Sequence, residues 1–126
     1  RAVANFRFFA AMAESFASEA HAVDGSALHY TLRQALGPVA CISPWNLPLY
    51  LLTWKLAPAL AAGNSVVAKP SEVTPLSAWL LSEILLEAGV PPGVVNIVHG
   101  RGANAGATLV GHRQIKAVSF TGSTAT

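Results

Sequence analysis

An asparagine between two prolines has the most sharply defined chemistry in this sequence. Asn46 lies in Pro44-Trp45-Asn46-Leu47-Pro48, which follows a short apolar stretch and precedes a longer one. Proline restricts the backbone, so an amide held in such a loop can direct an N–H donor at a developing oxyanion. An alternative interpretation is that Asn46 caps the helix that follows. Trp45 beside it is either a stacking wall for a ligand or a core residue.

A lysine and a glutamate follow the next apolar stretch. Lys69 ends the segment 65–69, which we expect to be a buried strand, and Glu72 comes shortly after it. At that place an ammonium and a carboxylate can each reach a ribose hydroxyl. A carboxylate there also repels a 2′-phosphate, which favours NAD over NADP. The alternative is an ion pair on the surface, which contributes at most about 1 kcal/mol.

A glycine-containing turn runs from Gly100 through Gly102 to Gly106. Its pattern is typical of a phosphate-binding turn, but also of an ordinary turn. No Asp or Glu follows Glu87, so the acidic residue of the standard dinucleotide fingerprint is missing. If a nucleotide binds here, its ribose contact must come from elsewhere in the chain.

The remaining candidate site residues lie in the last turn of the sequence and at its single cysteine. Gly122 and Ser123 can present backbone N–H groups and a hydroxyl to a pyrophosphate. Cys41 lies inside a predicted strand, which favours a packed, inert thiol over a nucleophile. One cysteine excludes an internal disulfide and a Cys-rich metal site. We predict no metal site, and the four histidines show no ligand spacing: His21, His29, His99 and His112.

Short apolar strands alternate with helices along most of the chain and must position these loops. Continuous apolar strands of this kind predict an α/β fold, a Rossmann-like parallel sheet with helices on both faces. Right-handed crossovers then bring the strand-to-helix loops to one edge. Thr74 is the expected N-cap of the second helix, and Gly63 and Gly89 are expected helix stops. The predicted strands are Val39–Ser43, Ser65–Lys69, Val94–Val98 and Ile115–Phe120, and the predicted helices are Leu49–Ala62, Pro75–Ala88 and Ala103–Val110.

The first 36 residues have a different pattern. Apolar residues recur at helical spacing from Val3 to Ala22, which predicts an amphipathic helix ended by Asp24-Gly25. From Leu28 to Arg33 the pattern alternates, which predicts a strand with one solvated face. We therefore expect two parts, residues 1–36 and residues 37–126.

The composition excludes several classes of protein. Of 126 residues 52% are hydrophobic and 11% are charged, which excludes disorder. The net charge is +2 with no basic stripe, so we expect no nucleic-acid partner. The most apolar stretch, Leu47–Ala62, is interrupted by Pro48, Lys55 and Pro58 and is too short to span a bilayer. With no signal peptide in the N-terminal segment, we expect no membrane partner and a cytoplasmic location.

Taken together and in this order, the motifs resemble the aldehyde dehydrogenase superfamily over nearly the whole chain. The resemblance rests on the Asn46 loop, Gly63-Asn64, the segment Lys69–Pro75 and the closing Phe120-Thr121-Gly122-Ser123-Thr124. The stretch Ile42–Lys55 also resembles the branch that oxidises 2-amino- or 2-hydroxymuconic semialdehyde.

The resemblance implies a role for each candidate residue. Asn46 is the oxyanion-hole amide, Lys69 and Glu72 hold the adenine ribose of NAD, and Phe120 packs near the nicotinamide. Ser43 and Trp45 are expected to line the cofactor cleft through backbone contacts, Gly102 and Gly106 to allow close approach of the adenine half, and Gly122 and Ser123 to meet the pyrophosphate. The implied reaction is attack of a cysteine thiolate on an aldehyde, hydride transfer to NAD and hydrolysis of a thioester.

In this family the nucleophilic cysteine and the general-base glutamate follow the Phe-Thr-Gly-Ser turn, so they are expected beyond residue 126. We therefore predict that residues 37–126 are a partial NAD-binding domain, that the isolated chain is inactive, and that its parent is a homodimer or homotetramer. One alternative is a non-catalytic nucleotide-binding or assembly module. Another is a fragment of an enzyme that transfers the acyl group to coenzyme A.

Overall fold

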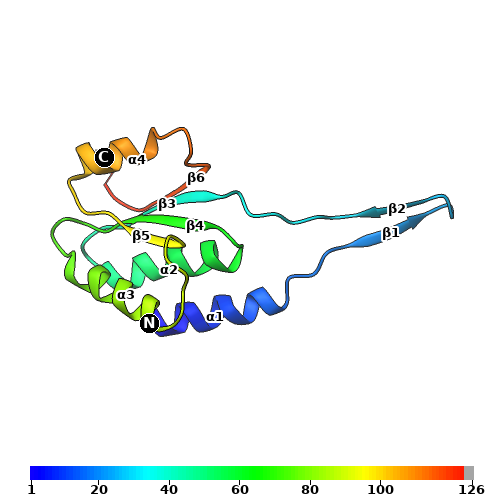
Figure 1. The fold of residues 1–126 in the computed structure, drawn as a ribbon, viewed down its shortest axis with the longest axis horizontal. Coiled ribbons are helices and arrows are strands. Elements are labelled where there is room, and N and C mark those ends of the chain that lie inside the picture. Colours follow the sequence, from blue (N-terminus) through cyan, green and yellow to red (C-terminus); the bar gives the residue numbers. More distant parts are fainter. Residues whose placement is uncertain (124–126) are drawn as a thin grey trace.

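A parallel sheet lies at the centre of the computed structural model, which describes residues 1–123 (Figure 1). It has four strands in the order β5-β4-β3-β6, and every neighbouring pair is parallel. Ile42 at the end of β3 pairs with both Lys69 and Phe120, the last residues of β4 and β6. These three carboxyl ends therefore lie level with one another. The strands are β3 Pro38–Ile42, β4 Ser65–Lys69, β5 Val95–Ile97 and β6 Ala117–Phe120.

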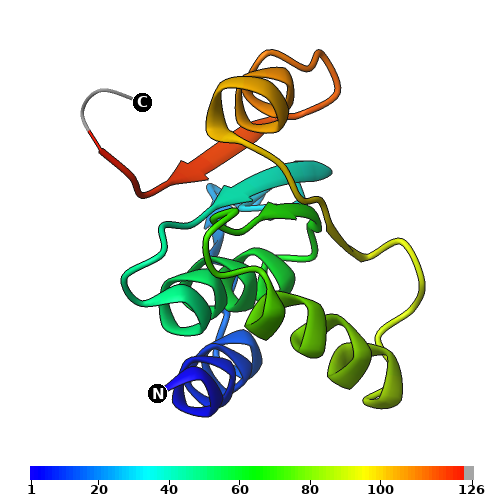
Figure 2. The same ribbon diagram turned by 90° about the vertical axis from the view of Figure 1, so that its left-hand side faces the viewer.

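Helices cover both faces of this sheet, so the predicted α/β architecture is confirmed (Figure 2). On one face lie α2 (Pro48–Ala61) and α3 (Leu76–Glu87), with α1 (Ala2–Glu14) against α2. The other face carries α4 (Ala107–Val110). The helix predicted from Ala103 to Val110 is in fact a π-helical turn, Gly102–Gly106, followed by these four residues of α-helix.

The core lies between the sheet and α2. Leu52 and Leu56 of α2 are fully buried and pack with Cys41 of β3 and Val66 of β4. The small side chains of the strands allow the helix to approach closely, because protein interiors are close-packed. The predicted glycine stops are confirmed: Gly63 and Gly89 follow α2 and α3 with φ of 79° and 83°.

The predicted single helix from Val3 to Ala22 is wrong. Helix α1 ends at Glu14, where the Ser15 hydroxyl donates a hydrogen bond to the carbonyl of Met12 (2.9 Å). Such a local bond competes with continuation of a helix. Residues Ala20–Val23 instead form β1, which pairs antiparallel with β2 (Ala27–Tyr30).

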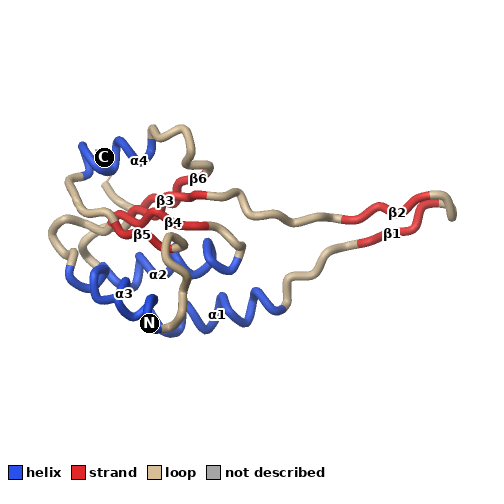
Figure 3. Tube along the Cα trace, viewed as in Figure 1, coloured by secondary structure: helices blue, strands red, loops and turns tan. Residues whose placement is uncertain are grey.

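The Asp24-Gly25 pair is the turn of this hairpin rather than a helix stop. Both residues have positive φ, 44° and 70°, a conformation typical of hairpin turns. The hairpin projects from the rest of the molecule (Figure 3). The predicted strand from Leu28 is present as far as Tyr30 in β2. Every residue of β1 and β2 is exposed, so the expected buried face is wrong.

Thr74 does not cap α3. The helix starts at Leu76 with Pro75 in the N-cap position and without a side-chain capping bond. Among the described residues the buried Thr74 hydroxyl has no hydrogen-bond partner. Ser71 supplies the local contact instead, because its hydroxyl accepts a bond from the Val73 N–H (3.3 Å).

Candidate functional site

Loops that follow β3, β4 and β6 line a cleft of about 450 Å³ at the carboxyl edge of the sheet. Strand register explains this meeting, because the three strands end level with one another. Backbone bonds hold the ends together: Ser43 N donates to Lys69 O (3.1 Å) and Thr121 N donates to Ile42 O (3.1 Å). Of the predicted site residues, all but Gly106 line this cleft: Ser43, Trp45, Asn46, Lys69, Glu72, Gly102, Phe120, Gly122 and Ser123.

Lys69 and Glu72 form an ion pair whose two members differ in exposure. Lys69 Nζ lies 3.4 Å from Glu72 Oε2, and the two side chains are 3% and 47% exposed. Lys69 Nζ also donates to the carbonyl of Pro70 (3.0 Å). The Lys69 ammonium is therefore buried beside a half-exposed carboxylate. This arrangement differs from the alternative considered for the sequence, an ion pair on the surface.

A hydrogen bond from its own backbone N–H lowers the pKa of Glu72. Desolvation opposes this shift, and the charge and hydrogen bond of Lys69 add to it. Arg101, in the glycine-containing turn, acts in the same direction. The Glu72 carboxylate therefore stays charged at neutral pH and remains an acceptor at the cleft.

Gly106 contributes behind the cleft rather than in it. It is buried, and a Cβ at this position would lie 3.7 Å from Cδ and 3.9 Å from Cε of Lys69. These are ordinary van der Waals distances, so an alanine would fit at this position beside the stem of Lys69. Gly102, at the start of the same turn, lies at the cleft.

The structure settles two alternatives around Asn46. Leu47 occupies the N-cap position of α2, and no side chain makes a capping bond, so Asn46 is not a helix cap. Trp45 is 62% exposed and lines the cleft, so it is not a core residue. Both side chains are therefore available to a ligand.

The turn after β6 passes close to an aromatic ring. A Cβ at Gly122 would overlap the ring of Phe120, which is 45% exposed and lines the cleft. Gly122 therefore allows the backbone to pass close to that ring.

Burial makes Cys41 inert, as predicted. It is 1% exposed, and desolvation raises the pKa of its thiol to about 11, although the charge of Lys55 opposes part of that effect. Since the thiolate is the nucleophile, this cysteine is protonated at neutral pH.

Lys55 and Thr121 are two residues of this region that sequence reasoning missed. Lys55 is 8% exposed, and its Nζ donates to Thr121 Oγ1 (2.8 Å) and Ser119 Oγ (3.3 Å). Burial lowers the pKa of Lys55, while the nearby Cys41 opposes that shift. The available signal was a charged residue in the middle of an otherwise apolar helix.

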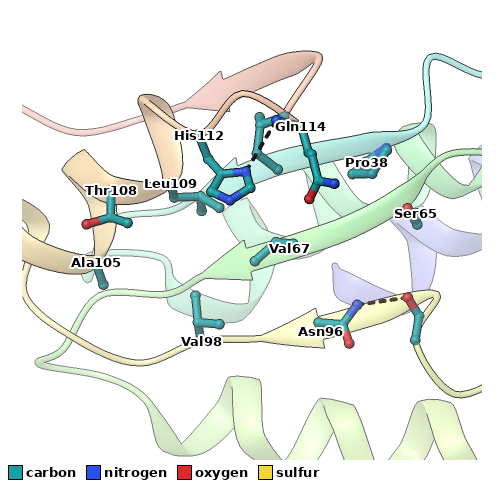
Figure 4. A pocket seen from close by; sticks show the side chains of 12 residues that line it. Pro38, Ser65, Val67, Asn96, Val98, Ala105, Thr108, Leu109, His112 and Gln114 are labelled. Carbon is teal, nitrogen blue, oxygen red and sulfur yellow. Dashed lines mark hydrogen bonds between the residues drawn. The ribbon is translucent and has the colours of Figure 1, made fainter.

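A second cavity, of about 590 Å³, lies between α4 and the sheet (Figure 4). Leu109 and His112 face Val67 and Val98 across it. Among the described residues no Asp, Glu, Lys or Arg lines this cavity. His112 Nδ1 accepts a bond from the backbone N–H of Gln114 (3.3 Å).

Within residues 1–123 no cluster of three or more His, Cys, Asp or Glu side chains is arranged to hold a metal ion. In the same part of the chain, no helix has the length and apolar character needed to cross a membrane.

Comparison with known proteins identifies the family. Residues 1–126 match the sequence profile of the aldehyde dehydrogenase family, and the chain belongs to this family. The resemblance inferred from the motifs is thereby confirmed.

Two relatives show which members of the family this chain is similar to. The chain is 58% identical over 124 residues to 2-aminomuconic semialdehyde dehydrogenase of Bos taurus, a match that covers 98% of this chain and 26% of the relative. It is 52% identical over 131 aligned positions to 2-hydroxymuconic semialdehyde dehydrogenase of Pseudomonas sp. strain CF600, with coverage of 100% and 27%. The chain thus spans about a quarter of the length of these relatives.

A solved structure shows the same fold. The NAD⁺ complex of an aldehyde dehydrogenase from Bacillus cereus superposes with a TM-score of 0.94 at 42% identity. The match covers 98% of this chain and 25% of that one.

Proposed function

We propose that this chain is the dinucleotide-binding part of an NAD-dependent aldehyde dehydrogenase that oxidises a muconic-type semialdehyde to a carboxylic acid. The observation that carries the proposal is one cleft lined by the buried Lys69 ammonium, the Glu72 carboxylate and the Asn46 amide. The names of the two relatives support the substrate class, and the Bacillus cereus NAD⁺ complex supports the cofactor.

Lys69 and Glu72 would hold the ribose of the cofactor. The ammonium donates to a hydroxyl oxygen and the carboxylate accepts from a hydroxyl group, and both bonds are charge-assisted. Because the pKa of Glu72 is lowered, its negative charge persists and repels a 2′-phosphate. This pair would therefore select NAD over NADP.

The other cleft residues fit the remaining parts of a dinucleotide. Gly122 and Ser123 would present polar groups to the pyrophosphate, and Phe120 would pack beside the nicotinamide. Ser43 and Trp45 would line the cleft through their backbone, while Gly102 and Gly106 would let the adenine half approach.

Asn46 would act on the substrate. NAD, when bound, supplies the hydride acceptor of the reaction. The Asn46 amide would donate a hydrogen bond to the oxyanion that forms when a nucleophile adds to the aldehyde. Cys41 is 1% exposed, with a pKa of about 11, so it would not be the nucleophile. As the family resemblance implies, the nucleophilic cysteine and the general-base glutamate would come from another part of the full-length protein.

The test uses the full-length gene product and the isolated 126-residue chain. With 2-aminomuconic or 2-hydroxymuconic semialdehyde as substrate, we expect the full-length protein to reduce NAD⁺ and to prefer it to NADP⁺. The isolated chain should show no oxidation. Failure of the full-length protein to bind NAD⁺ would refute the proposal, whereas activity on other aldehydes alone would refute only the substrate class.

A further inference from the structure

Helix α1 packs against α2 through a polar residue (Figure 2). In α1, all of whose residues the structure describes, Asn5 is the one buried residue, with 4% of its surface exposed. Its Nδ2 donates two hydrogen bonds to α2, one to the Tyr50 carbonyl (3.1 Å) and one to Thr53 Oγ1 (2.9 Å). Both hydrogens of the amide nitrogen therefore have a partner on the same neighbouring helix.

The two bonds of Asn5 define one register of α1 on α2. Tyr50 and Thr53 are three positions apart, so they lie on one face of α2. The other contacts between the helices include an edge-to-face pair of Phe9 and Trp54, with ring centroids 5.9 Å apart. Apolar contacts are non-directional and tolerate a shift of one helix along the other, whereas these two hydrogen bonds do not. A single buried asparagine fixes the register of paired helices in coiled coils in the same way.

Both acceptors keep another partner without Asn5. The Thr53 hydroxyl donates to the carbonyl of Leu49 (2.9 Å) or of Tyr50 (3.1 Å). Tyr50 lies within α2, where a carbonyl accepts the helical bond of the residue four positions later. An apolar side chain of similar volume at position 5 would therefore leave neither acceptor without a bond, and such a replacement costs little stability. Stability alone gives no reason for an asparagine at this place.

The contact between the two helices lies next to the Asn46 loop. Helix α2 begins at Pro48, two residues after Asn46, and Tyr50 lies in its first turn. The backbone N–H of Leu51 donates to the carbonyl of Leu47 (2.9 Å), which joins this turn to the end of the loop. A shift of the first turn of α2 therefore moves the backbone that carries the Asn46 amide at the cleft.

We propose that Asn5 is a positioning residue, whose two hydrogen bonds fix the register of α1 on α2 and thereby hold the Asn46 amide where it donates to the oxyanion. This role rests on the proposed function, because its consequence is the rate of aldehyde oxidation. A misplacement of about 1 Å caused by a distant substitution costs up to about 10²-fold in rate. Lys69 and Glu72 lie at the end of β4 and just after it, so NAD⁺ affinity should not depend on this register.

The experiment measures kcat, NAD⁺ dissociation constants and free energies of unfolding for variants of the full-length gene product, with an aldehyde that the wild type oxidises. Asn5→Leu should lower kcat by roughly tenfold, with unchanged NAD⁺ affinity and no loss of stability. Thr53→Val should lower kcat by about threefold, because it keeps the bond from Asn5 to Tyr50. The double variant should lose no more than about tenfold, since both substitutions act through one contact, whereas independent effects would multiply to about thirtyfold.

The control is Asn96→Leu, the same substitution at an asparagine of β5 whose Nδ2 donates to the Gly93 carbonyl (2.8 Å), and it should leave kcat unchanged. If Asn5→Leu does not fold, Thr53→Val keeps the asparagine and the volume of the replaced side chain, and its loss of kcat decides. Unchanged kcat in the folded variants, multiplying losses or an equal loss in Asn96→Leu would refute the positioning role. A wild-type protein that oxidises no aldehyde would instead refute the proposed function, and this role with it.

Discussion

The molecule has two hollows of similar size on the same sheet, and in the described residues only the smaller is lined by a lysine and a glutamate. The cavity under α4 has about 590 Å³ and the cleft at the carboxyl edge about 450 Å³. An ammonium, a carboxylate and a proline-flanked amide line the cleft. No Asp, Glu, Lys or Arg lines the described part of the cavity (Figure 4).

Strand direction accounts for this difference. Pro38 and Ser65, the first residues of β3 and β4, line the cavity, whereas residues at and beyond the ends of these strands line the cleft. Parallel strands present their carboxyl ends and following loops at one edge, where ligands of open α/β sheets bind. The position of a hollow at the carboxyl ends of the strands is therefore a better guide to function here than its volume.

The largest expected effect is on kcat. It tests the difference between the cleft and the cavity by substituting one amide side chain in each, Asn46 in the cleft and Gln114 in the cavity. In the full-length protein Asn46→Ala should lower kcat by about 10²–10³-fold, because it removes a donor to the oxyanion, and should leave NAD⁺ affinity unchanged. Gln114→Ala, in the cavity, should change neither value. Steady-state kinetics with NAD⁺ titration provides both measurements.

Equal losses of kcat in the Asn46 and Gln114 variants would remove the distinction between the two hollows. A loss of NAD⁺ affinity without a loss of kcat in the Asn46 variant would make this residue a cofactor contact rather than an oxyanion donor.

A smaller effect is expected at Glu72, the charged residue at the rim of the cleft. Glu72→Gln should lower the ratio of NAD⁺ to NADP⁺ affinity by roughly tenfold, since it removes the charge that repels a 2′-phosphate. Because the pKa of Glu72 is lowered and the 2′-phosphate loses its second proton at about pH 6, the wild-type ratio should stay constant from about pH 7 to pH 9. Dissociation constants for both cofactors test this, with Glu83→Gln on the exposed side of α3 as the control. An unchanged ratio in Glu72→Gln would mean that another residue selects the cofactor.

Much of the fold could be predicted because its signals are local. The apolar strands and the glycines after α2 and α3 each act within a few residues, so the parallel sheet followed from them. Only one strand of the β1–β2 hairpin could be predicted. The alternation from Leu28 indicated a strand that overlaps β2 (Ala27–Tyr30), whereas Ala20–Val23 was expected to be helical, and its residues are all exposed. Asp24-Gly25 is compatible with a helix stop and with a hairpin turn, and only the pairing of the strands decides between them.

The candidate site also has residues whose meeting local signals predict and one residue, Lys55, whose contacts they do not predict. Lys69 ends β4, and Asn46 and Gly122 lie in loops that follow β3 and β6, so their meeting at one edge follows from topology. Lys55 contacts side chains 64 and 66 positions away, and that contact depends on how α2 packs on the sheet. No local pattern encodes such a contact.

The smallest effect on activity is expected at Cys41, which lies on the sheet face that packs against α2. Cys41→Ala should keep activity close to that of the wild type, because the thiol is buried and protonated. In the native protein this residue should resist alkylation at pH 8, and unfolding should expose it. Peptide mapping after alkylation identifies the modified cysteine.

The raised pKa of Cys41 also predicts a pH dependence of stability. The folded state keeps the thiol proton up to about pH 11, while the unfolded state loses it near the ordinary value of 9.0. Between these values the native state binds more protons, so this group's contribution to stability falls as pH rises. Lys55 titrates in the opposite sense, because its pKa is lowered, and the difference between wild type and Cys41→Ala reports the thiol together with its interaction with Lys55. Urea unfolding from about pH 8 to pH 11 should show a steeper decline for the wild type than for the variant. Parallel declines would mean that the thiol is not desolvated, and a large loss of activity in Cys41→Ala would return this cysteine to the list of candidate nucleophiles.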